Sequence, residues 1–359
     1  MSPKSLLCYR AGPTALARVR AQGLAGQVRV FVAPATGPKW LVAYGFDQAL
    51  LASGLLTGPV RTVLAGASAG AWRALCFASP DAAKRHQALA AAYCEQVFGP
   101  RDTPFTVRAA FDNMLRTLFE GAERALVSES PYELAIHTAR ARGSGPGSPA
   151  RWHLAALGAA AVLNPLAARL QPLALERVTF HTAGAQEALR NLRAHRVALT
   201  PDNVLAAALA SATVPLSMEP VRAIPGAPPG SYLDGGMTDY HLADPYAHAG
   251  GVTLLFSHQP RIVARWLDQR VPWRRPAPSL LDTLVHVYPS PDFIARLPAG
   301  RVPSREDFVT LSEQPGERIR RWREAVAASE ELGESFTRDL ATGAFLEKLR
   351  LFEAGVPGS

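Results

Sequence analysis

The sequence predicts an α/β fold in three layers, in which helices cover both faces of a central mixed, mostly parallel sheet, followed by a helical C-terminal extension. Apolar runs of strand length alternate with segments of helical periodicity along the chain, and no internal repeat interrupts this order. Strands that are separated by helices favour a parallel or mixed sheet. The chain has 359 residues, 48% of them hydrophobic, which is enough to bury a large core.

The elements are expected in the following order. Residues 27–33 form the first predicted strand, 39–53 a helix, and 60–65 the second strand. Helices follow over 69–97, with a break at Pro80, and over 105–126, where apolar residues fall on one helical face. Further strands are expected over residues 132–139, 177–182, 231–233, 252–257 and 283–288.

The predicted organisation is a core over residues 1–257 and a C-terminal strand and helical extension over 258–359 that packs on it. In the extension, Ile319, Trp322 and Val326 form an apolar stripe among charged residues, which is typical of a helix on the outside of a core. Within the core, residues 143–175 form an apolar insert that begins with a Gly/Ser/Pro-rich linker. A lid or membrane-touching flap and a buried helix are both open interpretations of this insert.

Charge and cysteine content indicate the partners and the compartment. The formal net charge of +8 comes almost wholly from arginines, which are scattered among acidic residues, so we expect no nucleic-acid binding; contact with an anionic membrane surface stays open. The three cysteines show no paired or metal-binding spacing, and the N-terminal residues contain no apolar signal run. A cytoplasmic protein without a metal or another cofactor is the expectation.

The most informative motif is Gly66-Ala67-Ser68-Ala69-Gly70, which lies between an apolar strand and a helix-forming stretch. A serine at the apex of a strand–turn–helix adopts a strained backbone, and its neighbours must lack bulk because strand and helix approach closely there. The hydroxyl then stands clear of the sheet, at the N-terminus of the next helix. Ser68 is therefore the predicted nucleophile, with Gly66 and Gly70 as supporting residues.

A second motif, Asp234-Gly235-Gly236, places a carboxylate at the end of a short predicted strand. An Asp-Gly-Gly sequence is by itself simply a turn. Here it follows residues 207–215, which run from a helix through Ser211 into a turn that ends at Pro215. A carboxylate in contact with a serine hydroxyl can accept its proton when burial raises the carboxyl pKa.

Gly-x-Ser-x-Gly, then Ala-Ser-x-x-x-Pro, then Asp-Gly-Gly resemble the patatin-like phospholipase family in residues and in order, over about residues 28–257. The resemblance implies a patatin-like fold and a Ser–Asp dyad that hydrolyses acyl esters of lipids without a metal. Ser68 is then the nucleophile and Asp234 the general base, with Gly235 and Gly236 supporting the turn. A lipid or another acyl ester is the implied substrate.

Members of this family also carry a glycine-rich loop whose N–H groups form the oxyanion hole. The matching stretch here is 35–40, which keeps only Gly37 and the basic Lys39, and Pro38 has no N–H to donate. The loss of one oxyanion donor costs about 3–4 kcal/mol of transition-state stabilisation. The resemblance assigns the oxyanion hole to the N–H groups of Thr36, Gly37 and Lys39, and the helix N-terminus that follows Ser68 adds the N–H of Ala69.

Two alternatives stay open. A Ser-His-Asp triad is permitted by chain order, although only two predicted strands precede Ser68, which disfavours the α/β-hydrolase arrangement. The altered glycine loop is compatible with a protein that binds acyl chains or a partner without catalysis. The histidines that follow Asp234 and could complete a triad are His241, His248, His258 and His286.

For the remaining histidines we expect structural roles: His86, His137, His153, His181 and His195. The spacing of His241 and His248 with Asp239 and Asp244 gives no support for a metal site.

Overall fold

The structure is a computed structural model, and it describes residues 5–142, 158, 174–246, 250–271 and 273–352. One sheet of eleven strands runs through this part of the chain, in the order β11-β1-β10-β9-β2-β3-β4-β5-β6, with β8 pairing to β4 and β7 to β8. The neighbours from β10 to β4 are all parallel, whereas β1, β5 and β8 join antiparallel. The predicted α/β class with a mostly parallel central sheet is confirmed.

The strands have the following bounds: β1 Leu7–Ala11, β2 Val28–Ala33, β3 Val63–Ala67, β4 Glu133–Ala141, β5 Leu175–His181, β6 His195–Ala198, β7 Val221–Arg222, β8 Ser231–Leu233, β9 Val252–Phe256, β10 Leu284–Pro289 and β11 Leu349–Leu351. The α-helices are α1 Pro13–Gln22, α2 Tyr44–Ser53, α3 Ala69–Ala78, α4 Ala82–Cys94, α5 Pro104–Phe119, α8 Val204–Ser211, α9 Pro278–Leu281, α10 Pro291–Arg296, α11 Asp307–Thr310, α12 Pro315–Ala341 and α13 Ala344–Lys348.

Several elements differ from the sequence-based expectation. Strands β1, β6, β7 and β11 and helix α1 were not predicted, so three strands precede Ser68 instead of two. The predicted strand at 60 begins only at Val63, since Val60 is exposed. The helix expected over 39–53 is divided, because residues Gly37–Ala43 form the tighter 3₁₀ segment η1 before α2 begins. The helix expected to reach 126 ends at Phe119, just before Gly121 with a φ of 81°.

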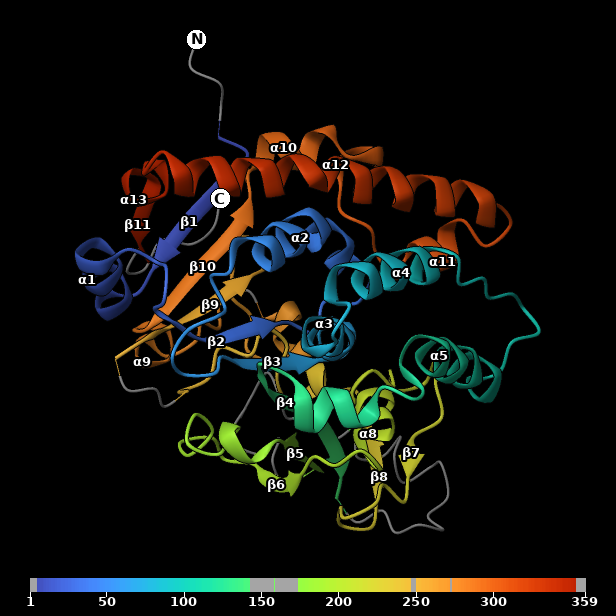
Figure 1. The fold of residues 1–359 in the computed structure, drawn as a ribbon. Helices are drawn as coiled ribbons and strands as arrows, with labels where there is room; N and C mark the ends of the chain where they lie inside the picture. The colour runs from blue at the N-terminus through green and yellow to red at the C-terminus, as the bar shows by residue number, and fades with distance from the viewer. Residues whose placement is uncertain (1–4, 143–157, 159–173, 247–249, 272, 353–359) are drawn as a thin grey trace.

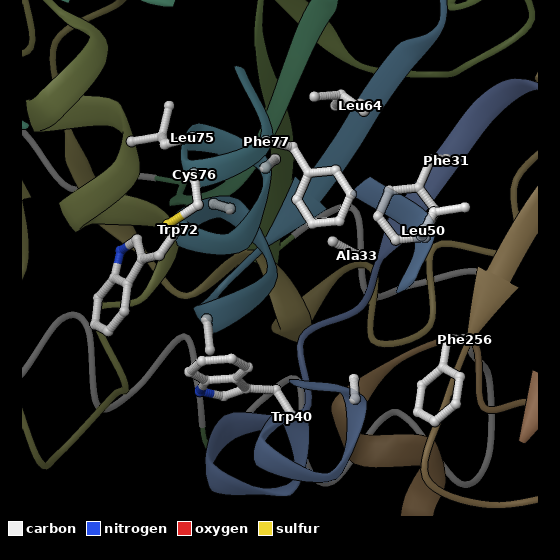
Figure 2. Close-up of a cluster of buried hydrophobic side chains, with 14 of the residues drawn as sticks. Phe31, Ala33, Trp40, Leu50, Leu64, Trp72, Leu75, Cys76, Phe77 and Phe256 are labelled. Carbon is white, nitrogen blue, oxygen red and sulfur yellow. The ribbon is translucent and has the colours of Figure 1, made fainter. Parts of the chain in front are cut away.

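The larger core lies between the sheet and one layer of helices. Helix α3 packs on β2, β3 and β4, while α12 lies on the outer side of this layer against α2 and α4 (Figure 1). Figure 2 shows Phe31 of β2 facing Phe77 of α3, and their ring centroids are 5.2 Å apart. Trp322 of the predicted apolar stripe is buried here. The opposite face of the sheet buries a second apolar cluster, which includes Tyr240 and Ile262.

Residues beyond 257 also enter the sheet, since β10 lies between β1 and β9. The predicted apolar insert over 143–175 lies outside the described residues apart from Gly158, Ala174 and Leu175. Among the helices of the described ranges, none is both long and apolar enough to cross a membrane.

Two glycines let α12 approach α2 closely. A Cβ added to Gly45 of α2 would lie 2.0 Å from the carbonyl oxygen of Ser329, and one added to Gly333 of α12 would lie 2.2 Å from that of Gly45. The N–H of Gly45 also donates to Ser329 Oγ at 3.0 Å. The absence of side chains at these two positions therefore sets the distance between the helices.

We expect Gly333→Ala to lower the free energy of unfolding by about 1–3 kcal/mol, because the added methyl group forces the backbones of α2 and α12 apart. The measurement is the midpoint of urea-induced unfolding. Gly316→Ala is the matched control on the same helix, since a Cβ at that position meets nothing within 4 Å. Equal midpoints for the two variants would contradict a close glycine contact.

Candidate functional site

Ser68 stands at the turn between β3 and α3 with a φ of 56° and a ψ of −133°, a backbone conformation that residues other than glycine seldom adopt. The two flanking glycines lie where a side chain would collide. A Cβ on Gly66 would lie 2.7 Å from the Cα of Ala71, and one on Gly70 would lie 1.9 Å from the carbonyl oxygen of Ala33. The close approach of strand and helix therefore explains why this turn contains glycine at both positions.

The carboxyl group of Asp234 lies directly beside this serine. Ser68 Oγ donates a hydrogen bond to Asp234 Oδ2 at 2.7 Å, and the other carboxyl oxygen, Oδ1, accepts from the N–H of Gly236 at 2.7 Å. Both side chains are buried. A Cβ on Gly235 would lie 2.1 Å from the carbonyl oxygen of His137, so the turn after β8 can press against β4 only with glycine there.

The C-terminal end of α8 holds both of these residues. The N–H of Ser68 donates to the carbonyl oxygen of Ser211 at 3.1 Å and to its Oγ at 2.9 Å, and Ser211 Oγ donates to the carbonyl oxygen of His137 at 2.6 Å. Two residues later, the carbonyl oxygen of Thr213 accepts from the N–H of Asp234 at 2.8 Å. The Ala-Ser-x-x-x-Pro segment thus fixes the backbones of Ser68 and Asp234 relative to each other.

The surroundings shift the protonation of Asp234. Burial raises the pKa of its carboxyl group above the ordinary value, because an ionised carboxylate loses its hydration there. The Arg305 guanidinium, the Ser68 hydroxyl and the N–H of Gly236 act in the opposite direction, and they lower the pKa only in part. The net result is a carboxylate that binds a proton more readily than one in water, as a general base requires.

Ser68 opens into an apolar cavity of about 500 Å³. Trp72 and Tyr93 line it, as do Met218 and Phe308 from more distant parts of the chain. Asp234 lines an adjoining cavity of about 340 Å³ together with Met237, Trp266 and Leu267. The serine therefore faces a space whose size and lining suit an apolar chain.

The four residues assigned to the oxyanion hole fall into two groups. Gly37 and Ala69 line the same cavity as Ser68, and each is the first residue of a helical segment, where backbone N–H groups have no acceptor within the helix. Thr36 and Lys39 line a different cavity of about 340 Å³, and the N–H of Thr36 donates to the carbonyl oxygen of Pro34 at 3.0 Å. Burial and the charge of Arg305 both lower the pKa of Lys39.

Two of the candidate triad histidines, His241 and His286, have hydrogen-bond partners other than Ser68. His241 Nδ1 accepts from the N–H of Val263 at 3.0 Å, and His286 Nε2 shares a 2.8 Å hydrogen bond with Ser257 Oγ. Burial lowers the pKa of His258 well below its ordinary value and that of His286 to about 3. His248 lies outside the described residues. Within the described part of the chain, the hydrogen-bond partner of the Ser68 hydroxyl is a carboxylate and not an imidazole.

The acidic residues considered for a metal site also have a different role. Asp239 and Asp244 both form ion pairs with Arg177, at 3.2 Å in the case of Asp244. Over the ranges that the structure describes, no three histidine, cysteine or acidic side chains converge as metal ligands would.

One residue of the site had no signal in the sequence. Arg305 comes from the loop before α11, and its Nη2 lies 3.7 Å from Asp234 Oδ2. Its side chain lines all three of the cavities described above. An arginine in a loop of an arginine-rich chain stands in no recognisable motif, so only the tertiary structure identifies it.

Comparison with family models identifies the family of this chain. The family model described as patatin-like phospholipase matches residues 41–245, which is more than half of the chain and includes Ser68, Ser211 and Asp234. The matched range begins after Lys39 and ends before Arg305. A search among curated proteins returned no match to this sequence.

We expect Ser211→Ala to lower the free energy of unfolding by about 1–3 kcal/mol, because it leaves the buried carbonyl oxygen of His137 without its donor and weakens the support of the strained turn at Ser68. Thermal unfolding measures the effect. Ser79→Ala is the matched control, since Ser79 Oγ donates only to the carbonyl oxygen of Leu75 in its own helix. A Ser211→Ala protein no less stable than the control would show that this hydrogen bond is dispensable.

Proposed function

Because the chain belongs to the patatin-like phospholipase family, whose members are lipid acyl hydrolases, we propose that it hydrolyses acyl esters of lipids with Ser68 as nucleophile and Asp234 as general base. The observation that carries the proposal is the 2.7 Å hydrogen bond from Ser68 Oγ to the buried carboxylate of Asp234. A base in direct contact with the hydroxyl that it deprotonates needs no intervening histidine.

The proposed reaction has two stages. In the first, Ser68 Oγ attacks the ester carbonyl carbon while Asp234 takes the hydroxyl proton, and the carbonyl oxygen becomes the oxyanion. Collapse of this intermediate forms the acyl-serine, and Asp234 returns the proton to the leaving alcohol. In the second stage Asp234 activates a water molecule, which releases the acid and restores Ser68. The N–H groups of Gly37 and Ala69 support this proposal as oxyanion donors, because both residues border the cavity at Ser68.

The apolar lining of the Ser68 cavity favours a lipid over a small polar ester. The aromatic residues that line it are Trp72, Tyr93, Phe98, Phe111 and Phe308. An acyl chain inside this space would lose contact with water over most of its length, which contributes about 0.8 kcal/mol for each buried CH₂ group. The head group of the lipid would remain nearer to the charged Arg305.

We expect Ser68→Ala to abolish both the hydrolysis of p-nitrophenyl esters and labelling by a fluorophosphonate, because no other group replaces the nucleophile. Asp234→Asn keeps the shape of the side chain without the proton acceptor, and kcat should fall by roughly 10²–10⁴-fold. Asp112→Asn on the exposed side of α5 is the matched control.

Three results would decide against the dyad. An unreactive Ser68 in the unmodified protein would favour a non-catalytic protein that binds acyl chains or a partner. Full activity of Ser68→Ala would exclude this nucleophile. A His258→Gln variant as impaired as Asp234→Asn would favour a triad.

The mouth of the cavity also fits contact with a membrane surface. Leu216 and Val309 line the cavity of Ser68 and are 72% and 76% exposed, which is unusual for large apolar side chains. Trp266, which lines the adjoining cavity, is partly exposed as well. We propose that these side chains enter the lipid interface of a cytoplasmic membrane surface while the positive net charge attracts anionic lipids.

We expect the double variant Leu216→Ser, Val309→Ser to sediment less with anionic vesicles than the unmodified protein, since two apolar contacts with the lipid interface are lost. Val60→Ser is the matched control: Val60 is also exposed, but it precedes β3 and therefore lies at the end of that strand opposite to Ser68. Equal sedimentation of all three proteins would argue against membrane contact through this face.

A further inference from the structure

Arg305 lines all three cavities, including the one that Ser68 lines and the one that Asp234 lines. Its Nη2 lies 3.7 Å from Asp234 Oδ2, the same oxygen that accepts the hydrogen bond of Ser68. Its Nε would lie 3.0 Å from a Cβ placed on Gly37. The guanidinium group of Arg305 therefore extends from Asp234, the proposed base, to Gly37 in the 35–40 loop.

The loop that carries Arg305 is anchored to the long helix α12. The carboxylate of Asp307 accepts from the N–H of Ser304 at 2.9 Å and from Nε1 of Trp322 at 2.8 Å, and it also pairs with Arg301. Trp322 is itself buried against the core. Ser304, the residue immediately before Arg305, is thus connected through Asp307 to the buried Trp322. This connection restricts where the Arg305 side chain begins.

The 35–40 loop, which would supply N–H donors to the oxyanion, has fewer of them free to do so. Pro38 has no N–H, and the N–H of Thr36 is engaged with Pro34 at 3.0 Å. A guanidinium carries five N–H donors in a planar fork and cannot be deprotonated in a protein, so it can interact with two oxygen atoms at once.

We propose that Arg305 is a further catalytic residue, which pairs with the Asp234 carboxylate in the resting site and stabilises the oxyanion of the tetrahedral intermediate. This inference rests on the proposed function. During attack, the bond between Ser68 Oγ and the carbonyl carbon forms, the proton passes from Oγ to Asp234, and the π electron pair moves onto the carbonyl oxygen. The negative charge therefore passes from Asp234 to that oxygen, and Arg305 faces one anion throughout the step.

The ion pair predicts a distinct pH dependence. Arg305 lowers the pKa of Asp234, so its removal should move the acid limb of kcat/KM to higher pH. Within the described part of the chain, the other titratable or hydroxyl groups near this carboxylate are the Ser68 hydroxyl and the phenols of Tyr93 and Tyr240. Burial raises the pKa of both phenols well above the working range. The acid limb should therefore report the ionisation of Asp234 under the influence of Arg305.

The experiment compares Arg305→Ala and Arg305→Lys with Arg296→Ala, a matched control whose exposed side chain pairs with Glu331 on the surface. We expect Arg305→Ala to lower kcat by roughly 10²–10³-fold with a small change in KM, and to shift the acid limb upward. Guanidinium ion at low, non-denaturing concentration should restore part of the lost activity. Arg305→Lys should keep the acid limb close to its original pH but recover little of kcat, because an ammonium group lacks the fork.

An Arg305→Ala protein with unchanged or higher kcat overturns the inference, and so does a loss of kcat without any shift of the acid limb. Labelling by fluorophosphonate tests the proposed function separately. If the unmodified protein is labelled at Ser68 and Arg305→Ala hydrolyses esters at the same rate, only the role of Arg305 is refuted. If the unmodified protein is neither labelled nor active, the proposed function fails and the role of Arg305 fails with it.

Discussion

The arrangement of the site depends on the backbone hydrogen bonds at the C-terminal end of α8. Ser211 accepts from the N–H of Ser68, and Thr213 accepts from the N–H of Asp234. Ser68 follows β3 and Asp234 follows β8, so the two residues are distant in sequence. Residues 211–213 nevertheless hold the backbones of both. The 2.7 Å contact between hydroxyl and carboxylate is thus set by the backbone, and the strained φ of Ser68 is maintained by bonds that the relaxed conformation would lose.

Two buried aspartates, Asp47 and Asp234, show how the surroundings can shift the pKa of a carboxyl group in opposite directions. Burial alone would raise the pKa of Asp47, but Arg73, which holds both carboxyl oxygens at 2.7 Å, and His86 lower it below its ordinary value. Asp47 therefore contributes stability above the pKa of the unfolded chain, and this contribution is lost as pH falls through the lowered value. Among the residues that the structure describes, the cation paired with Asp234 is Arg305, at the longer distance of 3.7 Å, and the pKa of Asp234 is raised. Its contribution is lost as pH rises through that raised value, which leaves a carboxylate able to accept a proton.

The sequence predicted those features that a local pattern specifies. The strand–turn–helix at Ser68 needs glycine on both sides because strand and helix nearly touch, and that need is visible in five consecutive residues. Among the described residues, the three-residue edge strand β11 pairs with a single strand, β1, so tertiary packing and not a local sequence pattern determines it. Arg305 could not be predicted for the same reason, since its position depends on the bond between Asp307 and Trp322 of α12.

The C-terminal part of the chain contributes to the candidate site as well as to the fold. The family match ends at residue 245, but β10 lies inside the sheet, and Arg305, Phe308 and Val309 form part of the cavity wall. Helix α12 joins the core to this loop, because it packs on α2 through Ser329 and Gly333 and holds the loop of Arg305 through Trp322. In the proposed mechanism, the loss of N–H donors from the 35–40 loop is tolerated, because Arg305 supplies a charge next to Asp234 from a loop anchored outside the matched region.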